Sequence, residues 1–188
     1  MKLETLRCTF PDATEDTWHQ HSNGGGWVQN TATVDTTAYV GPAAMVSGNA
    51  MVSGNALVAG NASVFGNARV SGDACVYGSA RVFGNACVYG DACVYGSARV
   101  SGITQVFGSA RVFGNACVYD NASVSGEARV YGNASVSGNA SVFGITQVFG
   151  SAIVSGNACV YDNASVSGED VITEYLLTSS SPVDILVI

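Results

Sequence analysis

Two histidines are the first candidates for chemistry in this 188-residue chain. His19 and His21 have a His-x-His spacing, which suits a partial metal site or a catalytic pair. Zinc sites take three or four protein ligands, and no third ligand stands near the pair in the sequence. We therefore predict no metal, no cofactor and no catalytic residue, and expect a polar surface packed beside Trp18 and Trp27.

The six cysteines offer thiol chemistry without the spacing of a zinc motif. No CxxC occurs and no cysteine is clustered with histidine, so no zinc site is predicted. The start of the chain, MKLETLRCTF, lacks the apolar core of a signal peptide, which favours a reducing compartment and free thiols. The Cα spacing expected for Cys75 and Cys93 would also permit a disulfide. The cysteines are Cys8, Cys75, Cys87, Cys93, Cys117 and Cys159.

Aromatic and cationic residues recur at intervals of 18 residues. A column of rings with this interval has two interpretations. It is a docking strip for a protein partner, a second copy or a glycan, or its rings stabilise successive coils at about 0.2 to 1 kcal/mol per pair. The arginines likewise either lie in water over neighbouring rings or bind a partner's carboxylates. The candidate partner-binding residues are Tyr77, Tyr95, Phe113, Tyr131, Phe149, Arg111 and Arg129.

A six-residue repeat positions all of these side chains. Valine fills all 24 slots from Val28 to Val166 without an insertion, and alanine or threonine stands two residues earlier from Ala32 to Ala164. Glycine follows two residues after valine in 19 of the 21 slots between Gly48 and Gly168, usually before asparagine. Residues two apart share one face of a strand, whereas a helix needs apolar spacings of three and four. The unit Ala-x-Val-x-Gly-Asn therefore predicts a short strand with Ala and Val inside, followed by a turn.

Strands this short must stack to bury their inner face. Three hexads form one coil of 18 residues, so the repeat predicts about eight coils in a triangular rod about 38 Å long. Valine and alanine fill the core, and the asparagines of successive coils form ladders at the corners. The ring column then lies on one face of the rod.

The pattern resembles the hexapeptide-repeat family of left-handed parallel β-helices. It is most similar to uncharacterised bacterial and prophage proteins with V-S-G-N-A-x-V repeats that follow a segment like HSNGGGWV, here residues 21–28. The resemblance covers residues 19–172 and implies an all-β fold with a left-handed coil. We expect an N-terminal cap at 1–27, the β-helix at 28–172, and a C-terminal cap or pairing strand at 173–188, whose last strand, 183–188, caps its own chain or pairs with another.

The charge and the residue content of the chain argue against several classes of function. The chain carries 7 basic and 14 acidic residues, a net charge of -7, which disfavours nucleic acid and anionic membranes as partners. The sequence contains no run of about 20 apolar residues, so we predict no transmembrane helix. The resemblance implies the acyltransferase as an alternative, but that activity uses a histidine base and a loop leaving the coil, and this chain has neither after His21. The γ-class carbonic anhydrases need three zinc-binding histidines, and this chain has only two. Ice binding needs arrays of outward threonines, whereas Thr104 and Thr146 occupy inward slots of the repeat.

We therefore expect a non-enzymatic structural or interaction protein. It is a rigid solenoid that binds a protein partner or forms a homo-oligomer. The resemblance to prophage sequences implies a phage-encoded accessory protein, a virion-associated protein or an inhibitor of a host factor. The expected location is the cytoplasm of a bacterial host or the virion. An ice- or glycan-binding surface is a minor alternative.

Overall fold

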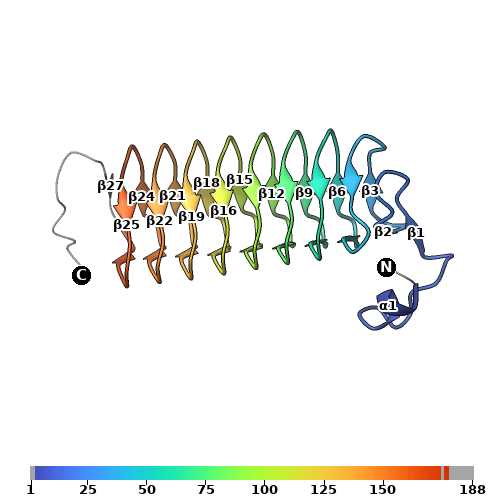
Figure 1. Ribbon diagram of the computed structural model, residues 1–188. Coiled ribbons are helices and arrows are strands. Elements are labelled where there is room, and N and C mark those ends of the chain that lie inside the picture. Colours follow the sequence, from blue (N-terminus) through green and yellow to red (C-terminus); the bar gives the residue numbers. More distant parts are fainter. Residues whose placement is uncertain (1–2, 175, 178–188) are drawn as a thin grey trace.

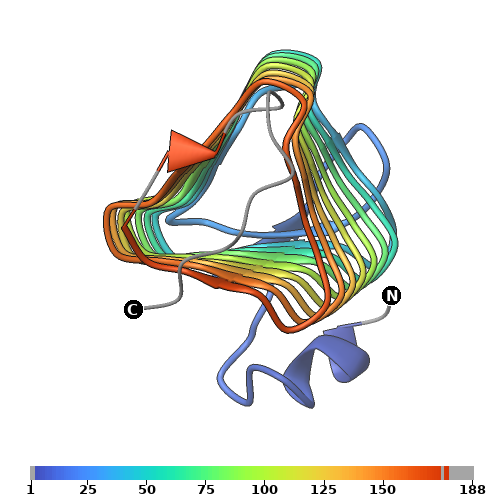
Figure 2. The same cartoon turned by 90° about the vertical axis from the view of Figure 1, so that its left-hand side faces the viewer.

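Short parallel strands wind into a rod of stacked coils, seen from the side in Figure 1. The computed structural model describes residues 3–174 and 176–177. Viewed along its axis, the rod has a triangular cross-section with one sheet on each side (Figure 2). The smallest of the three sheets has eight strands, which confirms an all-β triangular solenoid of about eight coils. The left-handed sense of the coil stays a prediction carried by the resemblance.

Each coil contributes one strand to each of three sheets. Sheet A contains β1 (Trp18–Gln20), β2 (Trp27–Gln29), β5 (Met45–Val46), β8 (Ser63–Val64), β11 (Arg81–Val82), β14 (Arg99–Val100), β17 (Cys117–Val118), β20 (Ser135–Val136), β23 (Ile153–Val154) and β26 (Val171–Ile172). Sheet B contains β3 (Thr33–Val34), β6 (Met51–Val52), β9 (Arg69–Val70), β12 (Cys87–Val88), β15 (Gln105–Val106), β18 (Ser123–Val124), β21 (Ser141–Val142), β24 (Cys159–Val160) and β27 (Leu176–Leu177). Sheet C contains β4 (Tyr39–Val40), β7 (Leu57–Val58), β10 (Cys75–Val76), β13 (Cys93–Val94), β16 (Arg111–Val112), β19 (Arg129–Val130), β22 (Gln147–Val148) and β25 (Ser165–Val166).

Backbone hydrogen bonds join successive coils in a constant register. Within the hexads, the N–H groups before and after valine donate to carbonyls of the next coil. In β16, for example, Arg111 donates to Ala128 at 2.8 Å and Phe113 donates to Val130 at 2.9 Å. Equivalent residues 18 apart therefore lie directly above one another, as Arg111 and Arg129 do. This register carries any outward residue type into a column along the rod.

The alanines and valines of the hexads fill the core, as predicted. From Val40 to Val160 the hexad valines are at most 1% exposed, and every alanine between Ala38 and Ala158 in the preceding slot is equally buried. The predicted asparagine ladders are also present at the corners. The side-chain amide of Asn115 donates to Asn133 at 3.1 Å, and similar bonds join other asparagines 18 residues apart.

The N-terminal segment covers the first edge of the rod in an irregular way. Helix α1 (Leu3–Arg7) lies beside the first coils (Figure 1), and a small apolar cluster of Leu6, Ala13, Trp18 and Trp27 joins it to them. Strand β1 pairs antiparallel with β2 and so covers the edge of sheet A. Residue 175 and residues 178–188, which include the strand expected at 183–188, lie outside the described residues.

Two threonines interrupt the apolar core and support a first prediction. Thr104 and Thr146 occupy alanine slots, are 0% exposed, and their Oγ1 atoms have no hydrogen-bond partner in the described structure. An unpaired buried hydroxyl costs free energy, which an isosteric valine avoids. We expect Thr104→Val to raise the free energy of unfolding by about 1 kcal/mol, measured as a higher urea midpoint. The exposed Thr36→Val is the control and should leave the midpoint unchanged. A lower midpoint for Thr104→Val would show that the hydroxyl has a partner such as a buried water.

Candidate functional site

The five predicted rings form one continuous column on sheet C. Each follows a hexad valine and therefore points outward, and the coil register sets the rings above one another. Ring centroids lie 4.9 Å apart for Tyr77 and Tyr95, and 4.8 Å apart from there to Phe113 and on to Tyr131. The last step, to Phe149, is 5.1 Å, and all four pairs are parallel to within 5°. We call these five residues the ring column.

Stacking leaves the ring column half-buried. Tyr77, at the N-terminal end, is 38% exposed, while the other four rings have intermediate exposure. Each inner ring covers the faces of its two neighbours, so the outward surface consists of ring edges. The rings are therefore stacked on one another, and their contribution to the stability of the coils stays a prediction. Docking on the same strip stays a prediction, since stacked rings can also serve a partner.

Two tyrosine hydroxyls of the ring column have defined surroundings. Tyr131 donates its hydroxyl to Oε1 of Gln147 on the next coil at 3.1 Å. Burial raises the pKa of the Tyr77 hydroxyl, and Tyr95 with two nearby thiols raises that pKa further, while Arg111 opposes the shift. Tyr77 therefore presents a neutral ring with a polar tip at neutral pH, and tyrosine rings of this kind are common in protein interfaces.

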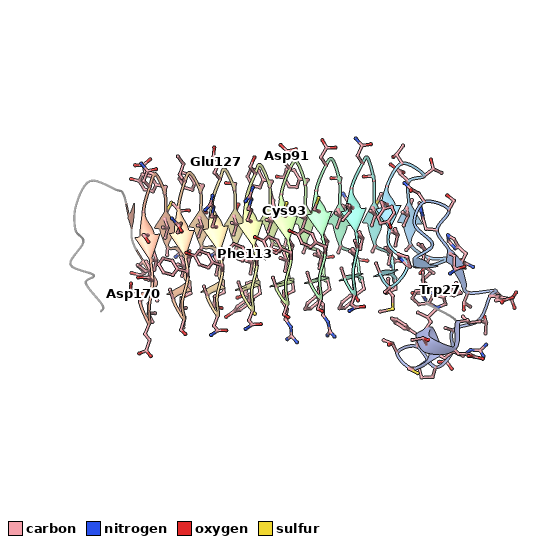
Figure 3. The ribbon with its side chains drawn as sticks, in the orientation of Figure 1. Trp27, Asp91, Cys93, Phe113, Glu127 and Asp170 are labelled. Atoms are coloured by element: carbon pink, nitrogen blue, oxygen red, sulfur yellow. The ribbon has the colours of Figure 1, made fainter. Side chains whose placement is uncertain are left out.

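Arg111 and Arg129 lie beside the ring column on β16 and β19. Both are exposed and in register, so two guanidinium groups follow one another along sheet C. The corner that precedes the strands of sheet C carries acids, since Asp91 before β13 and Glu127 before β19 project outward there (Figure 3). The face thus combines ring edges, two cations and bordering carboxylates. Such a mixture matches the aromatic and arginine content of protein interfaces. All seven predicted site residues are brought together on sheet C.

Other aromatic pairs show that stacking is a general device of the rod. Sheet A stacks Phe65 on Phe83 at 4.8 Å. Sheet B stacks Tyr89 on Phe107 at 5.0 Å, and a second pair there is separated by 5.4 Å. In the described part of the chain, the sheet C column is the longest of these series, with five rings against two. Its length, rather than stacking itself, sets it apart.

The histidines have structural partners in the cap. Nδ1 of His19 lies 2.7 Å from Oδ1 of Asn30. His21 is 6% exposed, and its Nδ1 accepts the N–H of Asn23 at 3.1 Å. Its Nε2 then carries the proton and donates to the carbonyl of Asp35 at 3.1 Å. His21 therefore ties the cap to the first coil of sheet B, and it is more buried than the polar surface we expected.

The described residues offer neither a metal cluster nor a membrane-spanning helix. No group of three or more His, Cys, Asp or Glu side chains is arranged there to hold a metal ion. Helix α1, which has five residues, is far too short to cross a membrane, and the described residues include no helix that could.

Three segments of the chain are similar to a known repeat. Residues 44–60, 68–84 and 128–144 match the model of the YdcK beta solenoid repeat. Neither curated proteins nor solved structures gave a significant match. The three matched segments lie within the stacked coils, in agreement with the observed fold. The chain is therefore a β-solenoid repeat protein, similar in these segments to the YdcK beta solenoid repeat.

Proposed function

We propose that the protein is a rigid, non-enzymatic scaffold that docks a protein through sheet C. The docked protein is a second copy of this chain or another protein. The observation that carries the proposal is the unbroken column of five rings from Tyr77 to Phe149 beside two exposed arginines. The setting that we propose is the accessory or virion-associated role of phage proteins that the sequence resemblance implies.

The rigidity of the rod supports this proposal. Coil-to-coil hydrogen bonds and a core without insertions hold the ring column in place before any partner arrives. A preformed face loses little conformational entropy on binding, so a modest contact area is enough for affinity. The net charge of -7 disfavours a nucleic acid or an anionic membrane as the partner, and it favours a basic protein where the partner is not a second copy.

The test compares the same type of double substitution, ring to aspartate, on sheet C and on sheet A. Tyr95→Asp/Phe113→Asp places charges in the middle of the ring column. Phe65→Asp/Phe83→Asp, the matched control, destroys the stacked pair on sheet A. Circular dichroism first establishes that both variants fold. We expect sedimentation velocity at about 50 μM, well above the Kd of a micromolar complex, to show an assembly of the native chain that only the sheet C variant loses.

If the native protein is monomeric, the test turns to partners other than a second copy of the chain. Affinity capture from a host lysate would then compare the same three proteins. The proposal requires a protein that the native chain and the sheet A variant retain and the sheet C variant loses. It is wrong if the native chain is monomeric and the three captures are the same.

A further inference from the structure

Two cysteines on sheet C are direct neighbours in adjacent coils. Cys75 on β10 and Cys93 on β13 are in register. Among the described residues, no other two cysteines pair in this way. Cys87 lies between an arginine and a glutamine of its column, and Cys117 lies between an arginine and a serine.

The two thiols point in the same direction. Sγ of Cys75 donates to the carbonyl of Asp73 at 3.6 Å, and Sγ of Cys93 donates to that of Asp91 at 3.7 Å. Equal contacts within equal coils mean equal side-chain rotamers, so one coil spacing of about 4.8 Å separates the two sulfur atoms. The same spacing separates their Cβ atoms, and this distance is longer than the separation of about 3.5–4.5 Å that is usual in disulfides. Both cysteines are free in the structure.

A sulfur separation of this size fits a bridging metal ion better than a disulfide. Zinc–thiolate bonds are about 2.3 Å long, and two bonds of about that length to a linear two-coordinate ion would span about 4.6 Å between the sulfur atoms. Thiolates are soft ligands and select soft cations such as Cu(I). We propose that Cys75 and Cys93 together form a two-thiolate site for a soft monovalent cation of the Cu(I) class. This inference does not depend on the proposed docking function.

The proton and charge balance of the site follows from its surroundings. Binding replaces two S–H protons with two metal–sulfur bonds, without any change in oxidation state, and leaves the site with a charge of -1. Burial raises the pKa of the Cys75 thiol, and Cys93 and then Asp73 raise that pKa further. Because the cation must displace thiol protons to bind, its affinity for the site rises with pH. Arg111, next to Cys93 in register, offsets the negative charge of the occupied site.

Competition for Cu(I) tests the proposal. The reduced protein is titrated without oxygen against a chromophoric Cu(I) chelator, and native protein is compared with Cys93→Ser. We expect the native chain to retain one Cu(I) at chelator concentrations at which Cys93→Ser has lost it, with at least a tenfold difference in affinity, because a single thiolate cannot chelate. Cys117→Ser is the matched control, since Cys117 has no cysteine neighbour in register, and it should bind as the native chain does.

Three outcomes would overturn the proposal. They are a native chain that loses all Cu(I) to the chelator, equal affinities of native protein and Cys93→Ser, and an equal loss in Cys117→Ser. Circular dichroism of each variant separates loss of ligand from loss of fold. Sulfur coordination is checked independently by X-ray absorption of the loaded native protein, which should show two sulfur neighbours and no nitrogen.

Discussion

Replacing Gly102 with alanine is expected to lower the free energy of unfolding by about 3 kcal/mol, through strain in the backbone and a clash with the next coil. Gly102 has a φ of +81°, a conformation that is costly for alanine. A Cβ atom there would lie 2.5 Å from the carbonyl oxygen of Asp120 and 2.7 Å from its nitrogen. That carbonyl already accepts the N–H of Ile103 at 2.6 Å, so it cannot move away without breaking the ladder.

Urea denaturation followed by circular dichroism measures this effect. The control is Asp120→Ala, in the equivalent slot one coil later. Asp120 already has a Cβ atom and a φ of 62°, so its substitution removes only the bond that its carboxylate accepts from the N–H of Gly138 at 3.2 Å. We expect a loss of about 1 kcal/mol for the control. Equal losses in the two variants would mean that the coil spacing adjusts freely and that close approach does not explain the glycine at this corner.

The periodic part of the molecule could be predicted from the sequence because one local rule repeats. Alternation within the hexad decides which side chains are buried, and the 18-residue coil decides which of them lie above one another. The stack from Tyr95 to Phe113, and the asparagine ladder, both follow from that arithmetic. The half-buried state of the rings did not follow, because it depends on how closely the rings cover one another.

The contacts within the N-terminal cap could not be predicted from the sequence, because the cap has no repeat. His21 was expected on a polar surface, but it is buried and bonded through both ring nitrogens. Its partners Asn23 and Asp35 lie 12 positions apart, on either side of β2 and β3, and Asn23 precedes the first hexad valine, so the repeat does not place it. The three consecutive glycines at 24–26 were the available signal, since such a run suggests close approach of two backbones. The proposed docking role of sheet C does not follow from the repeat either, because it depends on a second molecule.

Substitutions at two neighbouring glycines of that run, Gly25 and Gly26, distinguish the effect of a steric clash from the effect of backbone strain. Gly26 lies against the first coil of sheet C, where its N–H donates to the carbonyl of Val40 at 2.9 Å. A Cβ atom on Gly26 would lie 2.5 Å from Cγ1 of Val40 and would also collide with the carbonyl of Gly41. Gly25 differs in both respects, since its φ is +72° and a Cβ atom there would meet nothing within 4 Å.

We therefore expect Gly26→Ala to detach the cap from the rod, whereas Gly25→Ala costs about 1 kcal/mol of stability and leaves the cap in place. The chain's two tryptophans report this directly, because Trp18 and Trp27 both lie in the cap and are 3% and 7% exposed. Their fluorescence maximum should shift to the red, by about 10 nm or more, in Gly26→Ala alone, as buried indoles enter water.

Detachment of the cap also has a consequence for assembly. It would free the edge of sheet A that β1 now covers, so Gly26→Ala should self-associate end to end and sediment faster than the Gly25→Ala control. This contact would be independent of sheet C, and adding Tyr95→Asp/Phe113→Asp should leave it unchanged. A native tryptophan spectrum and sedimentation coefficient for Gly26→Ala would contradict the prediction. They would show that the bonds of His21 and the β1–β2 pairing hold the cap without close contact at Gly26.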